Sequence, residues 1–188
     1  PSWPDRDNFG RTEMEMTETE LYDCITEQLK ILNEIALSFN TKLQHVKPHG
    51  ALYNQSAKNK QIAVTIANAI KDFDASLILF GLSGSISISE AEKLHLKTAQ
   101  EVFADRTYQD DGSLTPRSRP NALIEDEEQA VRQALQMILQ NTVTTNSGKL
   151  ISIKADTICL HGDGKHAFQF CKLIHQTLKQ NHIEIKSL

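Results

Sequence analysis

The chain has 188 residues, 39% of them hydrophobic, with a formal net charge of −4 and a pI of about 6.0, which suits one domain with a substantial core. These values exclude the basic surface of a typical nucleic-acid-binding protein, and no apolar run approaches the ~20 residues of a membrane-spanning helix. The three cysteines form no C-x-x-C pair, which favours the reducing cytoplasm over a disulfide framework.

Helical and strand patterns alternate through the first half of the chain. The series Thr17-Glu18-Thr19-Glu20 is a capping-box signature, and apolar residues recur behind it at helical spacing. A continuous apolar run that ends at Gly81 is typical of a parallel strand buried on both faces. The predicted elements are a helix over 18–39, a strand over 43–46, a helix near 56–72, a strand over 77–80 and a short helix capped by Ser87.

The second half continues this alternation around a turn-rich loop. The loop runs from Tyr108 to Asn121 and is punctuated by Asp111-Gly112, Pro116 and Pro120. A polar connector follows the next helix. The predicted elements are a strand over 99–104, a helix over 125–140, a strand over 157–161, a helix over 165–181 and a last strand over 183–185.

Strands that alternate with helices imply a parallel sheet with right-handed crossover connections. An open sheet and a (β/α) barrel fit this pattern equally well. No repeat, low-complexity tract or linker divides the chain, so residues 1–188 are expected to form a single domain.

Chemistry-bearing side chains gather where the strand over 43–46 ends. Pro48 lacks an N–H group and holds Lys47 extended, so the strand stops with Lys47 and His49 at its carboxyl end. Gly50 and Tyr53 follow in the turn to the next helix. Because ligand sites form at the carboxyl ends of strands joined by helices, Lys47, His49 and Tyr53 are candidate site residues.

Residues two apart on a strand share a face, and three strands thereby carry ionisable groups on one face. The groups are His45 with Lys47, Glu101 with Asp105, and Cys159 with His161 and Asp163. The alternate positions are small and apolar, as expected of a face that helices cover. The ionisable faces are therefore predicted to meet in one site near the carboxyl ends of the strands.

Each candidate also has a structural interpretation. Lys47 could be a buried ion-pair partner of Glu101, since structural networks of this kind also perturb titration. His49 could cap the following helix rather than bind a ligand. Asp105 and Arg106 could brace a turn.

Two glycine-containing turns give weak signals. The stretch His161-Gly162-Asp163-Gly164 leads into a helix, so its amides could hold an anion. The stretch Gly81-Leu82-Ser83-Gly84-Ser85 lacks the Gly-Lys-Ser/Thr of a P-loop. It therefore predicts no nucleotide binding by that motif.

Four ordered motifs cover nearly the whole chain. They are Pro1-Ser2-Trp3-Pro4-Asp5-Arg6 with Phe9-Gly10-Arg11, then His45-Val46-Lys47-Pro48-His49-Gly50-Ala51-Leu52-Tyr53-Asn54, then Phe103-Ala104-Asp105-Arg106 through Pro116-Arg117-Ser118, and Ile158-Cys159-Leu160-His161-Gly162-Asp163. With these motifs the chain resembles the LamB/YcsF family, the family of the 5-oxoprolinase A subunit. Family members carry roughly 60 more residues at the N-terminus, so the chain resembles their C-terminal three quarters.

The resemblance implies a parallel (β/α) barrel of the glycoside hydrolase/deacetylase type, with about seven strands in the whole family. The resemblance thus favours the barrel over the open sheet, a choice that the alternation of strands and helices left open. The chain is expected to lack the first strands of that barrel, which leaves the barrel incomplete and an apolar edge exposed.

The resemblance also implies an activity, that of an ATP-dependent 5-oxoprolinase that opens the lactam of 5-oxo-L-proline to L-glutamate. ATP is the co-substrate of a complex with subunits B and C. The reaction needs cations for phosphate and carboxylate groups and a base for water. The candidate catalytic residues are Lys47, Asp105, His161 and Asp163, and the candidate substrate-binding residues are His49, Tyr53, Arg106 and Arg117.

Two other functions stay open. A metal-dependent amidohydrolase or deacetylase would act without ATP, with zinc on His161 and Asp163. A non-catalytic carrier would present a lactam to partner subunits. No metal triad of the deacetylase kind can be aligned with the chain, so no tightly bound metal is expected.

Overall fold

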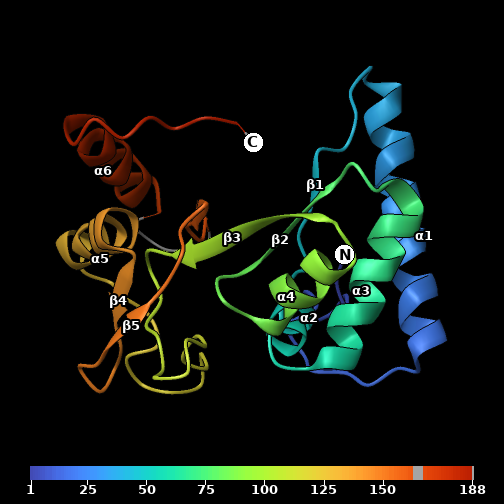
Figure 1. Ribbon diagram of the computed structural model, residues 1–188, viewed down its shortest axis with the longest axis horizontal. Coiled ribbons are helices and arrows are strands. Elements are labelled where there is room, and N and C mark those ends of the chain that lie inside the picture. The colour runs from blue at the N-terminus through green and yellow to red at the C-terminus, as the bar shows by residue number, and fades with distance from the viewer. Residues whose placement is uncertain (163–166, 188) are drawn as a thin grey trace. The chain divides into compact units, whose positions relative to one another are not determined.

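The computed structural model describes residues 1–162 and 167–187, and the chain divides into two compact units, Pro1–Gln100 and Glu101–Leu188 (Figure 1). The division falls within one continuous strand, β3 (Lys97–Phe103), so the prediction of a single barrel domain stays a prediction. Among the described residues, no helix combines the length and the apolar character that crossing a bilayer requires.

The first unit alternates helices with parallel strands, as predicted. Strands β1 and β2 pair in parallel, and α1 packs beside α3. The core contains Leu29 of α1, Val46 of β1 and Leu79 of β2. The elements are α1 (Glu18–Ser38), β1 (His45–Val46), α2 (Ala51–Ser56), α3 (Lys60–Asp74), β2 (Ile78–Leu82), α4 (Ile86–Lys93) and the start of β3.

Helix α1 begins as its sequence predicts. Thr17 Oγ1 accepts a hydrogen bond from Glu20 N, and the Glu20 carboxylate accepts one from Thr17 N, which completes the capping box. The inward stripe of Leu21, Ile25 and Leu29 is buried. The apolar residues of the later turns, Leu32, Ile35 and Phe39, are exposed although they continue the same periodicity.

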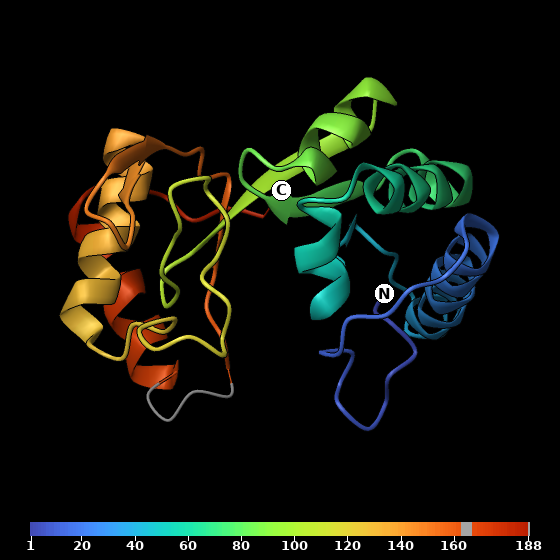
Figure 2. The same ribbon diagram turned by 90° about the horizontal axis from the view of Figure 1, so that it is seen from below.

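The second unit contains the remaining elements. Strand β3 pairs in parallel with β6, and β4 pairs with β5 in an antiparallel hairpin. Helices α5 and α6 lie side by side (Figure 2), with Ala134 of α5 and Ile174 of α6 in one cluster. The elements are the end of β3, α5 (Glu127–Gln140), β4 (Thr142–Thr144), β5 (Leu150–Ser152), β6 (Thr157–Cys159) and α6 (Ala167–Gln180).

Four predicted elements need correction. The helix predicted near 56–72 is α3, which begins at Lys60 because Asn59 caps it by accepting a hydrogen bond from Ile62 N, and the preceding helix α2 was not predicted. The short helix is capped at Ser85, and Ser87 lies inside it. The polar connector forms the β4–β5 hairpin. Residues 183–185 form no strand.

Gly50 sits where the amino-terminal segment contacts the start of α2. Its φ is +63°, and a Cβ added there would lie 2.3 Å from the Gly10 carbonyl oxygen. The next amide, Ala51 N, donates to that same oxygen at 2.9 Å. Only glycine permits both this backbone conformation and this close approach.

Replacing Gly50 with alanine is expected to lower the free energy of unfolding by about 2–4 kcal/mol, because strained backbone and overpacking combine. Urea unfolding of the variant measures the loss. Gly84→Ala is the matched control, since Gly84 has a φ of +69° but an added Cβ meets nothing within 4 Å. Equal losses in the two variants would contradict the role given to the Gly10 contact.

Candidate active site

The register of β3 and β6 positions two candidate residues next to each other. Phe103 lies opposite Cys159 in this parallel pair, so two residues further on Asp105 follows β3 and His161 follows β6. Both residues thus leave the sheet at the carboxyl ends of neighbouring strands, the edge at which ligand sites form.

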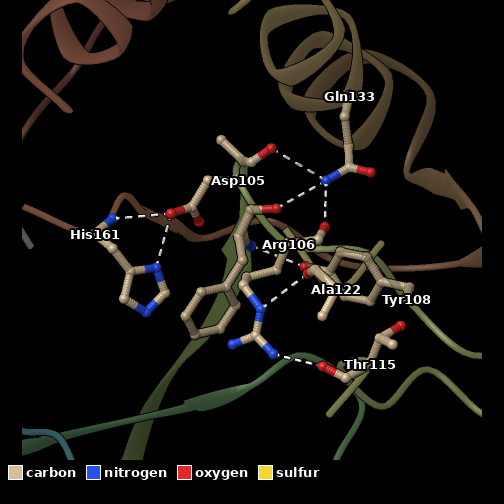
Figure 3. Close-up of polar contacts among 9 residues, drawn as sticks. Asp105, Arg106, Tyr108, Thr115, Ala122, Gln133 and His161 are labelled. Carbon is tan, nitrogen blue, oxygen red and sulfur yellow. Dashed lines mark hydrogen bonds and ion pairs between the residues drawn. The ribbon is translucent and has the colours of Figure 1, made fainter. Parts of the chain in front are cut away.

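Asp105 and His161 make a close, partly buried contact (Figure 3). Asp105 Oδ2 lies 2.8 Å from His161 Nδ1 and also accepts a hydrogen bond from His161 N at 3.3 Å. The two side chains are 12% and 25% exposed, respectively. The ring of Phe103 stacks on the imidazole at a centroid distance of 5.7 Å. The amide of His161 therefore does hold an anion, and that anion is the chain's own carboxylate.

The electrostatics of this pair determine which ring nitrogen is open. Burial acts to raise the pKa of Asp105, but the hydrogen bonds and charge of His161 outweigh it and the pKa lies below its ordinary value. Asp105 is thus ionised at neutral pH, and an ionised carboxylate only accepts hydrogen bonds. His161 Nδ1 must therefore be the donor, which leaves Nε2 as the nitrogen that can exchange a proton with a ligand.

The second oxygen of Asp105 is also available. Oδ1 is buried, and no donor in residues 1–162 or 167–187 reaches it. A buried carboxylate oxygen without a donor is costly, so it is a natural acceptor for a water molecule or a ligand N–H.

Arg106 points into the loop that follows β3. Its Nε donates to the Ala122 carbonyl at 3.2 Å, and its Nη2 donates to the Thr115 carbonyl at 2.6 Å. Burial and then the charge of Arg117 lower the pKa of Arg106 from its ordinary value. Arg106 therefore braces a turn through these two contacts, as its structural interpretation predicts. The carboxylate of Asp105 instead contacts His161.

Arg117 lies at the turn of the same loop. Arg119 N donates to the Pro116 carbonyl and closes this turn, and both arginine side chains are exposed. Because Arg117 lies close enough to lower the pKa of Arg106, the loop presents a second cation near the first.

Three candidates, Lys47, His49 and Tyr53, lie in the first unit. Lys47 Nζ lies 5.7 Å from the centroid of the Tyr53 ring, a cation–π geometry, and Tyr53 is buried at the start of α2. His49 Nε2 lies 3.0 Å from the Phe9 carbonyl oxygen. His49 does not cap α2, whose N-cap residue is Gly50.

A cavity of about 520 Å³ opens beside His49, which is within the size range of small-molecule sites. Its lining includes Arg6, Phe9 and Cys24. Sequence reasoning named His49 as a candidate but not the other lining residues, because neither the polar amino-terminal segment nor the helix that carries Cys24 has a pattern that marks a cavity wall.

The structure thus brings Asp105 together with His161, and it brings Lys47 together with Tyr53. Asp163, a predicted catalytic residue, lies outside the described residues. The prediction of one site at the three strand ends stays a prediction.

Sequence reasoning missed Gln133. Its side-chain amide on α5 donates to the carbonyls of Phe103, Ala104 and Arg106 at the end of β3 (Figure 3). A signal was present, because Gln133 is a polar residue within the helical stripe of the buried Ala130 and Met137.

The described parts of the chain bear on two kinds of site, a cluster of metal ligands and a phosphate-binding turn at 81–85. Residues 1–162 and 167–187 contain no group of three or more His, Cys, Asp or Glu side chains that could hold a metal ion. The expectation of no tightly bound metal stays a prediction. The turn at 81–85 is closed by the chain itself, since Ser83 Oγ and Gly84 N both donate to Gln100 Oε1.

Comparison with known proteins gives consistent relatives. The model of the LamB/YcsF family matches residues 1–188. A protein of Staphylococcus epidermidis, named as the A subunit of 5-oxoprolinase, is 48% identical over 188 residues, which are 100% of this chain and 75% of that protein. A protein of the same name from Histophilus somni is 49% identical over 187 residues, 100% of this chain and 76% of that protein.

A solved structure has the same fold. The lactam utilization protein from Thermus thermophilus superimposes with a TM-score of 0.92 at 36% identity, over 100% of this chain and 75% of that one. The predicted fold class, an α/β fold with parallel strands consistent with an incomplete (β/α) barrel, is confirmed by this match.

Proposed function

The chain belongs to the LamB/YcsF family, and on this basis we propose that it acts as the A subunit of an ATP-dependent 5-oxoprolinase. In this proposal the complex hydrolyses the lactam of 5-oxo-L-proline to L-glutamate and couples this step to hydrolysis of ATP. The names of the relatives from S. epidermidis and H. somni support the activity. Within this chain, the Asp105–His161 pair is the observation that supports the proposed activity. Opening a lactam requires a base that removes a proton from water, and this pair can supply one.

The difficulty of the reaction explains the need for ATP. A lactam is a stable amide, and phosphoryl transfer to its carbonyl oxygen makes the ring carbon open to attack by water. The oxygen of one water molecule then bonds to that carbon and the ring C–N bond breaks, which leaves a free amine and an acyl phosphate. A second water molecule hydrolyses the acyl phosphate to the carboxylate of L-glutamate and inorganic phosphate. A base must accept the proton of the water, and cations must stabilise the negative charge.

We assign the base to His161. Its Nε2 accepts a proton from water, while Asp105 Oδ2 holds the Nδ1–H group and stabilises the imidazolium that forms. This is the division of roles that a histidine and a carboxylate have in other hydrolases. Asp163 keeps its predicted role as an alternative base or orienting group.

The cations have two sources in this proposal. Lys47 supplies positive charge to the phosphorylated oxygen, and Arg117 binds the substrate carboxylate. His49 and Tyr53 are proposed to contact the lactam. Arg106 keeps its predicted substrate role, although its guanidinium already donates to the Ala122 and Thr115 carbonyls.

The complex is proposed to include subunits B and C, with ATP as co-substrate. We do not assign the ATP phosphates to the turn at 81–85 of this chain, since Gln100 already occupies its Gly84 amide. The nucleotide-binding and phosphoryl-transfer steps can therefore reside elsewhere in the complex.

The test is an assay of the full-length protein with candidate subunits B and C. We expect formation of L-glutamate and ADP from 5-oxoproline and ATP only when all three proteins are present. Omitting ATP should abolish glutamate formation. Lactam opening by the protein alone without ATP would overturn the proposal, and so would its absence from the complete mixture.

Arg117→Ala is expected to raise the KM for 5-oxoproline with a smaller change in kcat. A charged hydrogen bond to the substrate carboxylate is worth about 1.5–3 kcal/mol, which corresponds to roughly a tenfold to hundredfold change in KM. Steady-state kinetics of the full-length, partnered enzyme measures it. Arg119→Ala is the matched control, because Arg119 is an exposed arginine of the same turn. An unchanged KM in Arg117→Ala would remove Arg117 from the site.

A further inference from the structure

Side chains bind the backbone at the end of β3, in addition to its pairing with β6. Tyr108 Oη accepts a hydrogen bond from Phe103 N at 2.8 Å. Gln133 Nε2 lies 3.0 Å from the Phe103 carbonyl oxygen, 3.3 Å from that of Ala104 and 2.8 Å from that of Arg106. One side chain of α5 thus contacts three carbonyls around Asp105.

These contacts define the backbone path through Asp105. The carbonyls of residues 103, 104 and 106 can converge on one nitrogen only if the chain turns at Asp105, as Figure 3 shows. The Asp105 carbonyl is held separately by Ile124 N at 2.9 Å. The backbone on both sides of Asp105 is therefore fixed, and its side chain is left directed at His161.

We propose that Gln133 and Tyr108 are positioning residues, which hold the end of β3 so that Asp105 stays in hydrogen-bonding distance of His161 Nδ1. This inference rests on the proposed catalytic role of the Asp105–His161 pair. Neither positioning residue touches substrate in this proposal. Both act through the backbone that carries Asp105.

The burial of Tyr108 makes it suitable for this role. Its side chain is fully buried, and burial raises the pKa of its hydroxyl well above the ordinary value. The hydroxyl therefore stays neutral across the working pH range. The Phe103 amide keeps one acceptor throughout, and losing it would leave a buried N–H without a partner.

Small displacements at this point have large catalytic consequences. A misplacement of about 1 Å can lower a rate by a factor of about 10² even when the substituted residue is remote from the chemistry. Catalytic groups keep their geometry when a surrounding layer of hydrogen bonds locks their backbone and rotamers. Gln133 supplies such hydrogen bonds from helix α5.

The test uses Gln133→Leu and Tyr108→Phe in the full-length protein with its partner subunits. Both changes remove hydrogen-bonding groups and nearly conserve volume. We expect kcat to fall about tenfold to a hundredfold with an unchanged KM for 5-oxoproline. Gln136→Leu is the matched control, because Gln136 lies one turn away on α5 and bonds the Thr142 and Thr144 hydroxyls instead.

Two NMR readouts distinguish positioning from general stability. In full-length Gln133→Leu, the carboxyl carbon of Asp105 should titrate at higher pH than in the wild type, since it loses the hydrogen bonds that lower its pKa. The nitrogen shifts of the His161 ring should show a mixture of tautomers. Gln136→Leu should change neither.

The outcomes separate this inference from the proposed function. If Gln133→Leu and Tyr108→Phe both leave kcat, the Asp105 titration and the His161 tautomer as in the wild type, the inference is overturned. If Gln133→Leu fails to fold, the same three readouts on Tyr108→Phe decide. If the wild type lacks 5-oxoprolinase activity, the proposed function fails, while the two NMR readouts still decide the positioning role.

Discussion

His161→Asn is expected to lower kcat for lactam opening by about 10²–10⁴, the range for loss of a general acid–base group. Asparagine can place its amide N–H near the position of Nδ1, so the hydrogen bond to Asp105 Oδ2 can be kept. It has no counterpart of Nε2, so proton transfer from water is lost. The variant thus separates the two functions of the ring.

Steady-state kinetics of the full-length, partnered enzyme across pH measures this effect, and circular dichroism confirms folding. The pH dependence that belongs to the base should disappear from kcat in the variant. His175→Asn is the matched control, since His175 is an exposed histidine of α6. A kcat near the wild-type value in His161→Asn would show that the Asp105–His161 pair is structural.

Lys47→Met is expected to lower kcat by about 10²–10³, the loss seen when one electrostatic stabiliser of a transition state is removed. Methionine keeps most of the aliphatic stem, so the half-buried packing beside Tyr53 changes little. The loss should appear in kcat rather than in KM, because the charge is needed when negative charge develops on the lactam oxygen.

Lys58→Met provides the comparison for Lys47, because Lys58 is an exposed lysine that follows α2 in the same unit. Rates of glutamate formation at saturating ATP and 5-oxoproline distinguish the two variants. If Lys47→Met behaves as Lys58→Met does, the cation of the site must come from another residue, and the interaction of Lys47 with Tyr53 is structural.

The strongly periodic elements could be predicted from the sequence because their signals are local. The capping box of Thr17 and Glu20 marks the start of α1, and an apolar run ending near Gly81 marks β2. Helix α2 was missed because it has six residues and begins where Gly50 contacts Gly10, far away in the sequence. No local pattern contains a tertiary contact of that kind.

The β4–β5 hairpin was missed for a different reason. Each of its strands has three residues, and β4 contains one buried side chain, Val143, between two threonines. Alternation over three residues does not differ from chance, and the turn at 146–148 is typical of any loop. Short strands of this kind become evident only through their pairing partner.

The Asp105–His161 pair shows what alternation can and cannot predict. Side-chain alternation placed both residues on ionisable faces at strand ends, and the structure does bring them together. Their contact depends on β3 and β6 being neighbours in register, which the sequence does not state. The contacts of Gln133 required still more, because they involve backbone carbonyls, which have no sequence signature.

The position of Trp3 makes the two units spectroscopically different. It is the single tryptophan of these 188 residues, it is 2% exposed, and its indole N–H donates to Gln55 Oε1 at 2.6 Å. Its emission therefore reports the opening of the first unit, whereas α5 and α6 of the second unit contribute to far-ultraviolet circular dichroism without any tryptophan signal. Coincident denaturation midpoints from the two probes would indicate one cooperative domain, and separate midpoints would indicate two.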